Sequence, residues 1–310
     1  MQRNMTGSMA NGKPISELMP EGQRVQAPAA ATKNANANVD LFTPWLKKWH
    51  LVQDGAPITT PGSSLLPVKM NGAPSMLKIA GDEHEIRGGK VLEWWDGNGA
   101  ARVFSLSANA LVMERAQGQQ SLMHMALHGQ DDQASRIACN TLAKLHAHAQ
   151  NVSHRPELAP LSMWFDELFA AARYDSVLQE SASAAQRLLA EPEDLTVLHG
   201  DIHHENILDF EDRGWLAIDP KGLLGERGFD YANLIMNPDL PTVTDPARFT
   251  RQVHVVSQTA GLDRRRLLSW VLAFAGLSAV WFRQDACEAQ AQQDLNVARL
   301  AIQALSQNLD

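Results

Sequence analysis

The sequence has few cysteines, no excess of basic residues and no long apolar run, and each shortage excludes a class of protein. Its two cysteines, Cys139 and Cys287, are too few for a disulfide framework or a zinc site of four cysteines, and they suit a cytoplasmic protein. The formal net charge of −8 at pH 7 argues against a general nucleic-acid binder, which needs a basic surface.

Apolar segments long enough for targeting or membrane insertion are missing as well. Residues 1–38 contain no apolar run of the length found in signal peptides, so export is not expected. The most apolar stretch, residues 267–282, has 16 residues, which is short of the ~20 that cross a bilayer. We therefore predict a buried core helix there and no membrane partner.

The remaining composition is typical of a globular protein of two lobes. Apolar residues make up 45% of the 310 residues and charged residues 20%, which is ordinary for a soluble fold. Residues 1–38 are rich in Asn, Ala, Gly, Gln and Pro without helical or strand periodicity, and we predict a disordered extension there. Residues 39–116 then form a predicted N-lobe and residues 117–310 a predicted C-lobe.

The two lobes differ in their predicted elements, and the fold class is α+β. The N-lobe elements are a helix over 41–49, a β-hairpin around Asn71-Gly72, a helix over 83–95 that Gly88 and Gly89 weaken, and strands over 101–106 and 110–114. The larger C-lobe is mostly helical, with predicted helices over 131–149, 161–174, 176–189, 246–259, 263–284 and 289–305. Two strand-like runs, 195–198 and 215–218, interrupt these helices.

The strongest motif directly follows the first of these runs. It reads His199-Gly200-Asp201-Ile202-His203-His204-Glu205-Asn206, and Asp219 follows the second run. An Asp and an Asn five positions apart on a loop can place one carboxylate at a substrate hydroxyl and an amide oxygen at a metal ion. A carboxylate after the next strand then completes a Mg²⁺ site beside the phosphates of ATP. This pattern is typical of the catalytic loop of kinases.

A lysine in the N-lobe strengthens this interpretation. Lys78 lies amid apolar residues, where a strand that faces the core would not otherwise carry a charge. Kinases use such a lysine to hold the α- and β-phosphates, and a carboxylate from the next helix pairs with it. Glu85 is the predicted partner and Glu83 the alternative, since the sequence does not fix the rotation of the helix.

With these motifs the chain resembles the aminoglycoside phosphotransferases of the protein-kinase-like fold. Within that family it is similar to the group of streptomycin 6-phosphotransferases and hydroxyurea phosphotransferases. The resemblance runs from about residue 41 to 305, and its most specific segments are 64–68, 76–78, 95–97, 114–116, 199–201, 206–208, 218–222 and 225–233.

The resemblance implies a bilobed fold, a requirement for ATP and Mg²⁺, and a role for each matching residue. Asp201 would be the catalytic base, and Asn206 and Asp219 would bind Mg²⁺. Asp230 would brace the catalytic loop. The implied contacts of ATP are Lys78 with Glu85 at the phosphates, Ser63 and Ser64 in the loop over the nucleotide, and Glu114, Arg115 and Ala116 at the hinge that meets adenine.

Three departures from protein kinases indicate a small-molecule kinase that needs no phosphorylation switch. Residues 57–72 lack a G-x-G-x-x-G loop, so a short turn with serine is expected over the phosphates. Gly200 stands where protein kinases carry the Arg that answers a phosphorylated activation loop. Pro220 replaces the Phe of D-F-G, whose packing toggles many protein kinases.

The charge distribution indicates a cationic acceptor. Residues 1–150 carry 14 Lys and Arg against 12 Asp and Glu, whereas residues 151–310 carry 13 against 23. We therefore expect anionic ATP on the N-lobe and a small cationic molecule such as streptomycin on the C-lobe, phosphorylated at a hydroxyl group. The candidate acceptor-binding residues are Glu205, Glu226, Asp166 and Glu167.

Other interpretations were weighed against this one. A kinase of hydroxyurea or of another small metabolite, and a nucleotide-binding pseudokinase, are the alternatives closest to it. A metallohydrolase built on the histidines of the motif lacks a recognised ligand spacing. His124 and His128 are expected to be ordinary surface or core residues, and the pair Trp94-Trp95 is expected to pack under the N-lobe sheet.

Overall fold

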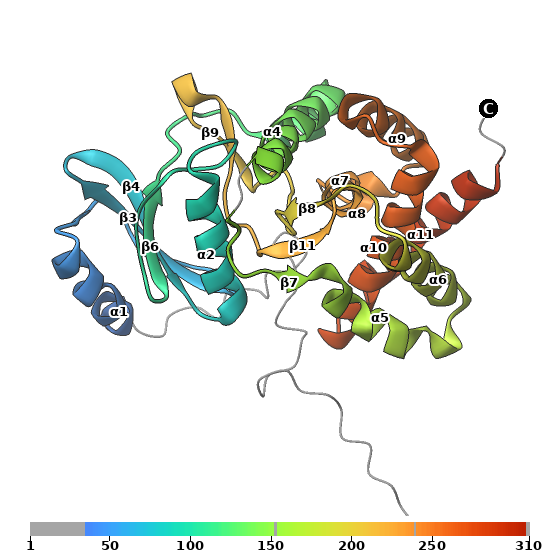
Figure 1. Ribbon diagram of the computed structural model, residues 1–310, viewed down its shortest axis with the longest axis horizontal. Helices are drawn as coiled ribbons and strands as arrows, with labels where there is room; N and C mark the ends of the chain where they lie inside the picture. Colours follow the sequence, from blue (N-terminus) through green and yellow to red (C-terminus); the bar gives the residue numbers. More distant parts are fainter. Residues whose placement is uncertain (1–34, 152–153, 239, 308–310) are drawn as a thin grey trace, which may run out of the picture.

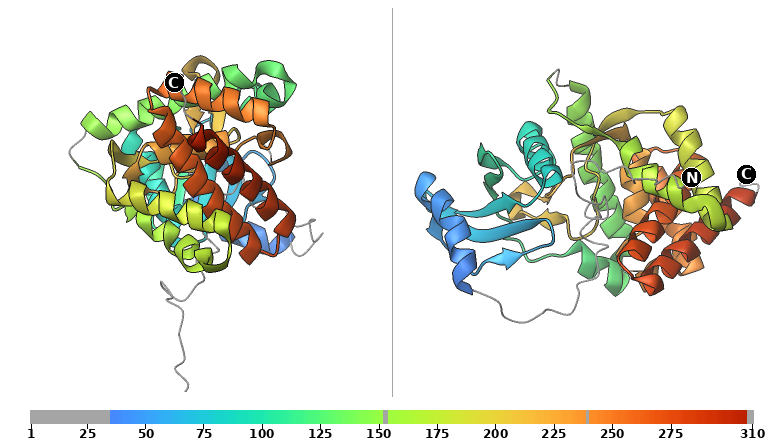
Figure 2. Two further views of the ribbon diagram at one scale, coloured as in Figure 1. Left: turned by 90° about the vertical axis from the view of Figure 1, so that its right-hand side faces the viewer. Right: turned by 90° about the horizontal axis from the view of Figure 1, so that it is seen from below.

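The computed structural model describes residues 35–151, 154–238 and 240–307. They form a small lobe built on an antiparallel sheet and a larger, mainly helical lobe (Figures 1 and 2). The predicted α+β class and bilobed arrangement are therefore confirmed. Residues 1–34 lie outside the described residues. Helix α1 (Ala35–Lys48) begins inside the segment predicted to be a disordered extension, because its first turns carry no apolar periodicity that would reveal a helix.

The N-lobe sheet has the order β1-β3-β4-β6-β5, with β2 also paired to β3, and every pairing is antiparallel. Its strands are β1 (Val52–Gln53), β2 (Ile58–Thr59), β3 (Ser63–Met70), β4 (Ala73–Ala80), β5 (Val103–Ser107) and β6 (Ala110–Glu114). The predicted hairpin joins β3 to β4. Asn71 and Gly72 have φ angles of 51° and 83°, the left-handed conformation that this two-residue turn requires.

Two helices cover opposite faces of this sheet (Figure 1). Phe42 of α1 packs on one face against Leu77 and Ile79 of β4. Helix α2 (Glu83–Trp95) lies on the other face, toward the larger lobe. Because successive side chains of a strand alternate between faces, Lys78 points to the α2 side of the sheet. The strand pattern thus directs this lysine toward the space between the lobes.

The C-lobe is built around helix α10 (Arg264–Gln284). This helix is long and apolar enough to cross a membrane, but 83% of its most apolar 18 residues are buried inside the fold, so the predicted core helix is confirmed. It packs against α6, α7 and α11. The other helices are α3 (Leu122–Met125), α4 (Asp131–Asn151), α5 (Asp166–Ala171), α6 (Ser176–Ala190), α7 (Gly228–Ile235), α8 (Leu240–Val243), α9 (Pro246–Ala260) and α11 (Glu288–Ser306).

Two small sheets position the loops that carry the sequence motif. One has the order β7-β11-β8 and the other pairs β9 with β10. Residues 199–206 connect β8 to β9, and residues 218–222 connect β10 to β11, so both loops run between the two sheets. The strands are β7 (Ala159–Pro160), β8 (Leu195–Leu198), β9 (Ile207–Asp209), β10 (Trp215–Ala217) and β11 (Leu223–Glu226).

Some C-lobe elements differ from the prediction. The helix expected over 161–174 is divided into a 3₁₀ turn, the short helix α5 and a second 3₁₀ turn. Strands β7, β9 and β11 were not predicted, because two to four residues carry no periodicity and such strands form only through their partners. Helix α7 was missed because its eight residues are fewer than the window over which helical periodicity can be read.

The interface of α10 and α11 contains a buried carboxyl group that makes stability depend on pH. Asp294 is fully buried beside Ser278, and burial raises its pKa to about 8. The folded protein therefore keeps a proton that the unfolded chain releases above a pKa of about 4. Its contribution to the free energy of unfolding falls as pH rises from 4 to 8, by about 1.4 kcal/mol per pH unit.

We expect Asp294→Asn to remove this slope. The variant should come closest to the wild type near pH 4, where the carboxyl group is neutral in the folded protein and about half protonated in the unfolded chain, and should be the more stable protein near pH 8. Urea unfolding between pH 4 and pH 8.5 measures the difference. Parallel stability curves for the two proteins would contradict the assignment.

Candidate active site

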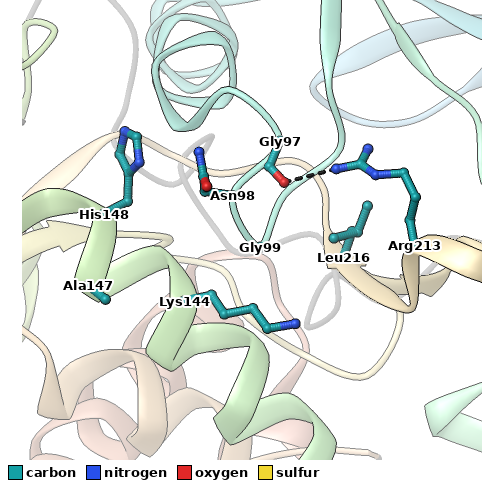
Figure 3. Close-up of a pocket in the computed structure, with 8 residues that line it drawn as sticks. All are labelled: Gly97, Asn98, Gly99, Lys144, Ala147, His148, Arg213 and Leu216. Carbon is teal, nitrogen blue, oxygen red and sulfur yellow. Dashed lines mark hydrogen bonds between the residues drawn. The ribbon is translucent and has the colours of Figure 1, made fainter.

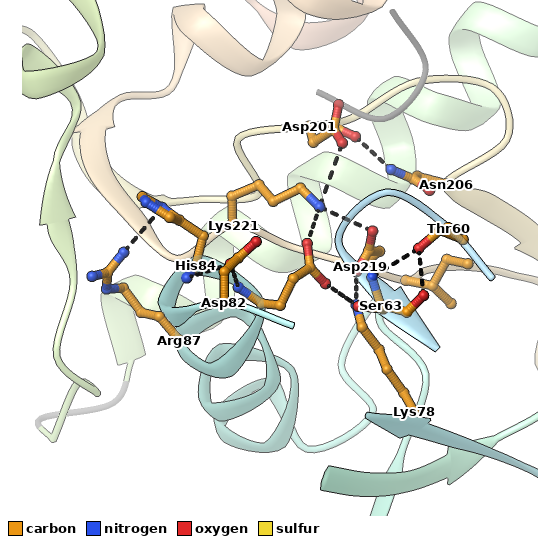
Figure 4. A network of polar contacts seen from close by, with 12 residues as sticks. Thr60, Ser63, Lys78, Asp82, His84, Arg87, Asp201, Asn206, Asp219 and Lys221 are labelled. Carbon is orange, nitrogen blue, oxygen red and sulfur yellow. Dashed lines mark hydrogen bonds and ion pairs between the residues drawn. The ribbon is translucent and has the colours of Figure 1, made fainter. Parts of the chain in front are cut away.

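Three carboxylates and two lysines form a buried network between the lobes (Figure 4). Lys78 forms ion pairs with Glu85 of α2 and with Asp219. Lys221 Nζ lies 2.6 Å from Glu85 Oε1, 3.0 Å from Asp219 Oδ2 and 3.7 Å from Asp201 Oδ2. None of the five residues is more than 9% exposed. Burial by itself would lower the pKa of Lys78, but the charges of Asp219 and Glu85 outweigh burial and raise it, so this lysine stays charged.

The start of α2 decides which glutamate meets Lys78. The carboxylate of Asp82 accepts hydrogen bonds from the backbone N–H groups of His84 and Glu85, at 2.9 and 3.0 Å, and so caps the helix. This cap turns Glu85 inward, whereas Glu83 is exposed. Ser63 Oγ donates to Glu85 Oε2 at 2.9 Å and fixes that side chain further. The structure forms the Lys78–Glu85 pair and not the Glu83 alternative.

Helix α2 rests directly on the main chain that follows Asp219. A Cβ atom on Gly88 would lie 1.8 Å from the carbonyl oxygen of Pro220, so no side chain fits there. Gly88, one of the two glycines that weaken the helix in sequence, is therefore required by this contact, whereas a Cβ atom on Gly89 would lie 2.9 Å from Leu111. At the end of α2, Trp95 stacks on His199 with ring centroids 6.2 Å apart. The tryptophan thus lies against the loop of the motif and belongs to the buried cluster that also includes Leu111 and Met113 of β6.

Two main-chain hydrogen bonds join the loop 199–206 to the segment 218–222. Lys221 N donates to His199 O at 2.7 Å, and Ile218 N donates to Asn206 O at 2.9 Å. Gly200 has a φ angle of +86°, and a Cβ atom there would lie 2.9 Å from Leu223 and 3.3 Å from Lys221. The glycine that replaces the kinase Arg therefore permits the two segments to approach each other.

Asp230 braces this loop, as predicted. Its Oδ2 accepts from His199 N at 3.0 Å and its Oδ1 accepts from Gly200 N at 2.8 Å. His199 Nε2 donates to the carbonyl oxygen of Ile218 at 2.7 Å, and its Nδ1 accepts from Asp201 N at 3.2 Å. Burial lowers the pKa of His199, so the ring is neutral and its tautomer is fixed by these two partners.

Asn206 and Asp219 provide a donor set that fits Mg²⁺. Asn206 Nδ2 donates to the carbonyl oxygen of Asp201 at 2.8 Å, which leaves the amide oxygen for another partner. The backbone hydrogen bond from Ile218 N to Asn206 O holds Asn206 against the segment that carries Asp219. Mg²⁺ is held in kinases by one or two such oxygens together with phosphate oxygens and water.

A transition-metal cluster, by contrast, is not formed. Across residues 35–151, 154–238 and 240–307, no group of three or more His, Cys, Asp or Glu side chains could hold a metal ion. His204 is buried beside Arg248, and burial lowers its pKa to about 3. His124 and His128 stack on each other at the surface, as ordinary exposed residues.

Of the residues expected around ATP, Ser63 contacts the network directly, through Glu85. The turn between β2 and β3 is closed by hydrogen bonds between Thr60 and Ser63, so a short turn stands where a glycine-rich loop is absent. Ser64 follows it, half-buried in β3. Ala116 packs with the partly buried Leu208 and Ile218 in a small apolar cluster.

The side chains of the two preceding hinge residues are engaged within the protein. Glu114 pairs with Arg213, and Arg115 pairs with Asp54. Arg213 Nη2 also donates to the carbonyl oxygen of Gly97 at 2.9 Å, at the rim of a cavity of about 610 Å³ beside the hinge (Figure 3). The residues lining this cavity do not include the carboxylates or lysines of the network; they are Gly97, Asn98, Gly99, Lys144, Ala147, His148, Arg213 and Leu216.

The four predicted acceptor-binding residues are not brought together. Glu205 is exposed on the loop between Asp201 and Asn206. Asp166 is exposed at the start of α5, and Glu167 beside it is half-buried against α10, where burial raises its pKa. Helix α5 packs on α6 and α10, so its two acidic residues belong to another part of the lobe than Glu205.

The surroundings of Glu226 do not agree with the prediction that it binds the acceptor. It is 4% exposed, and both of its carboxylate oxygens are engaged. Arg266 Nε and Trp270 Nε1 donate to Oε1 at 2.7 and 2.6 Å, and the backbone N–H of Glu193 donates to Oε2 at 3.0 Å. Its closeness to the motif in sequence is misleading, because strand β11 carries it away from the loop.

The sequence reasoning assigned no role to Lys221, although this residue joins all three carboxylates of the network. A signal was present. Like Lys78, Lys221 is a lone lysine between apolar residues, here Ile218 and Leu223, and a buried lysine requires a partner of opposite charge.

Comparison with known proteins agrees with this geometry. Residues 48–286 match the family of aminoglycoside/hydroxyurea antibiotic resistance kinases. The chain is 49% identical over 245 residues to the streptomycin 3''-kinase of Klebsiella pneumoniae, covering 77% of this chain and 91% of the relative. It is 30% identical over 270 residues to the streptomycin 6-kinase of Streptomyces griseus, covering 81% and 85% of the two chains.

A solved structure shares the fold at low sequence identity. It is a thermostable mutant of an aminoglycoside phosphotransferase in a ternary complex with AMP-PNP and hygromycin B. Its TM-score is 0.59 at 12% identity, and the match covers 86% of this chain and 100% of that chain. The fold is thus protein-kinase-like, and the sequence match over most of the chain means that this protein belongs to the aminoglycoside/hydroxyurea antibiotic resistance kinase family of phosphotransferases.

Proposed function

We propose that this protein transfers the γ-phosphoryl group of ATP to a hydroxyl group of streptomycin. The observation that supports this most is the convergence of Asp201, Asn206 and Asp219 with the Lys78–Glu85 pair in one buried network. Phosphoryl transfer requires little covalent chemistry from a protein. It requires a base, metal ligands and a phosphate-binding cation, held in fixed positions.

Each residue has one task in this proposal. Asp201 orients the acceptor hydroxyl and takes its proton while the hydroxyl oxygen attacks the γ-phosphorus. Lys78, held by Glu85, contacts the α- and β-phosphates. Asn206 and Asp219 would hold Mg²⁺, which neutralises negative charge on the phosphate oxygens. The turn with Ser63 and Ser64 covers the phosphates, and the main chain of residues 114–116 meets adenine.

The hydroxyl group of streptomycin that we propose as the acceptor differs from the one that the sequence predicted. The resemblance in the sequence favoured the 6-hydroxyl group. The identity of 49% with a streptomycin 3''-kinase, against 30% with a 6-kinase, favours the 3''-hydroxyl group instead. We therefore propose streptomycin 3''-phosphorylation, and hydroxyurea, which the family description includes, is the second acceptor to test.

The charge of the acceptor fits this choice. Streptomycin is cationic, and residues 151–310 carry 13 Lys and Arg against 23 Asp and Glu. Glu205 is the acidic residue that we assign to the acceptor, because it is exposed on the same loop as Asp201. A charge-assisted hydrogen bond from a guanidinium group to this carboxylate would hold the acceptor beside the base.

The first prediction separates the base from the metal ligand. Asp201→Asn should lower kcat by about 10²–10⁴-fold and leave the Kd of Mg·ADP nearly unchanged, because the base contacts the acceptor. Asp219→Asn should weaken Mg·ADP binding strongly. Calorimetric titration and a coupled assay of ADP release measure both, with melting temperatures as a check of folding. Turnover of Asp201→Asn near the wild-type value would remove Asp201 from the mechanism.

The second prediction concerns the acceptor. Incubation with ATP, Mg²⁺ and streptomycin should yield a singly phosphorylated product whose ³¹P–¹H correlation spectrum places the phosphate on the 3'' position. Parallel reactions with hydroxyurea should be slower. A phosphate on the 6 position would reverse the proposed position, and the absence of product with streptomycin beside product with hydroxyurea would reject the acceptor.

The third prediction tests Glu205 with Glu226 as its contrast. Glu205→Gln should raise the KM for streptomycin about fivefold, which corresponds to ~1 kcal/mol for an exposed ionic contact, with the KM for ATP unchanged. The wild-type KM for streptomycin should rise with salt concentration more than the KM for ATP. Glu226→Gln should instead lower the free energy of unfolding, by about 3 kcal/mol. An unchanged acceptor KM in Glu205→Gln would exclude Glu205.

A further inference from the structure

The proposed function gives no task to Lys221, although its side chain contacts all three carboxylates of the network. Its Nζ lies 3.0 Å from Asp219 Oδ2 and 3.7 Å from Asp201 Oδ2 (Figure 4). In the proposed function these carboxylates mark the two ends of the transfer, since Asp219 holds the metal on the phosphate side and Asp201 holds the acceptor hydroxyl. The ammonium group of Lys221 therefore stands on the path that the phosphoryl group takes.

This position is fixed by the backbone. Lys221 N donates to His199 O at 2.7 Å, and Gly222, with a φ angle of +68°, directs the chain away into β11. Gly200 leaves room beside the Lys221 side chain, because a Cβ atom there would lie 3.3 Å from Lys221 Cβ. The main chain of Lys221 is thus attached to the loop that carries Asp201, and its Nζ also pairs with Glu85 of α2 at 2.6 Å.

The loop itself provides no other cation for this task. Residues 199–206 contain no Lys or Arg. Both ring nitrogens of His199 are already engaged, since Nε2 donates to the carbonyl oxygen of Ile218 at 2.7 Å and Nδ1 accepts from Asp201 N at 3.2 Å. Lys78 is already assigned to the α- and β-phosphates. The charge that develops on the transferred group then needs a donor from outside the loop.

Building on the proposed function, we propose that Lys221 is a catalytic residue that binds the γ-phosphoryl group of ATP and stabilises it during transfer. With Mg·ATP bound, Asp219 would hold the metal ion, and the ammonium group of Lys221 would contact the γ-phosphoryl oxygens in place of Asp219. The bond from the acceptor oxygen to phosphorus forms while the bond from phosphorus to the β-phosphate oxygen breaks. The electron pair leaves with ADP and the hydroxyl proton goes to Asp201, while Lys221 keeps its own proton.

The test compares two nucleotides that differ in the γ-phosphate. Lys221→Met should weaken Mg·AMP-PNP binding by about tenfold or more but Mg·ADP binding by less than threefold, because only AMP-PNP carries the group that Lys221 contacts. Lys78→Met should weaken both to a similar extent. Lys90→Met, on the exposed side of α2, is the control that should change neither.

Turnover gives the second measurement. Lys221→Met should lower kcat by about 10³-fold, in the range of other charge-stabilising cations in phosphoryl transfer, with little change in acceptor KM. Lys221→Arg, which keeps the charge, should recover part of this loss. Should Lys221→Met lose its folded transition, Lys221→Gln is used for the same comparison.

Two results would overturn the inference. Equal weakening of AMP-PNP and ADP binding would mean that Lys221 only balances the charge of the network, and a kcat within threefold of the wild type would mean the same. The nucleotide comparison needs no acceptor. If the wild type phosphorylates none of the acceptors, the proposed function fails, and the two binding constants still decide the role of Lys221.

Discussion

The protein depends on one electrostatic constraint, the neutralisation of three carboxylates buried between its lobes. In the described part of the chain, Asp201, Asp219 and Glu85 form ion pairs with Lys78 and Lys221, and none of the five residues is more than 9% exposed. Buried charges of this kind are tolerated only when they are paired, and removing one partner is strongly destabilising. Because Lys78 and Glu85 come from the N-lobe and the other three from C-lobe loops, the network also sets how the lobes meet. Its excess negative charge suits a divalent cation bound with a nucleotide.

Close approach of main chains is what allows the network to form. Helix α2 touches the carbonyl oxygen of Pro220 through Gly88, and the loop of Asp201 approaches Lys221 through Gly200. A glycine inside a helix weakens it by about 1 kcal/mol relative to alanine. As an isolated helix, α2 is therefore less stable than it would be with alanine at position 88. Asp230 and the neutral ring of His199 then fix the loop, so Asp201, the proposed base, has its main chain held in place in the unliganded protein.

The departures from protein kinases have a common physical basis. Where protein kinases carry the Arg of their catalytic triplet, this chain needs Gly200, because the φ angle is +86° and a side chain would meet Leu223 and Lys221. Where they carry the Phe of D-F-G, this chain has Pro220, whose carbonyl oxygen supports α2. Both positions are occupied by packing contacts that leave no switch residue in place, as suits an enzyme of the antibiotic resistance kinase family.

Local residue patterns alone were sufficient to predict the paired strands around Asn71-Gly72, the helix over 83–95 and the buried helix α10. They also identified Lys78, Asp201, Asn206 and Asp219 as candidate site residues. These predictions were possible because turn chemistry, apolar periodicity and motif spacing depend on residues close together in the sequence. Only the tertiary structure decided that Glu85 and not Glu83 meets Lys78, that Glu226 pairs with Arg266 and that Lys221 joins the three carboxylates. The formation of the strands of two to four residues was likewise decided only by the tertiary structure. In each case the partner is distant along the chain, and neither the rotation of a helix nor the path of a loop is fixed until the lobes pack together.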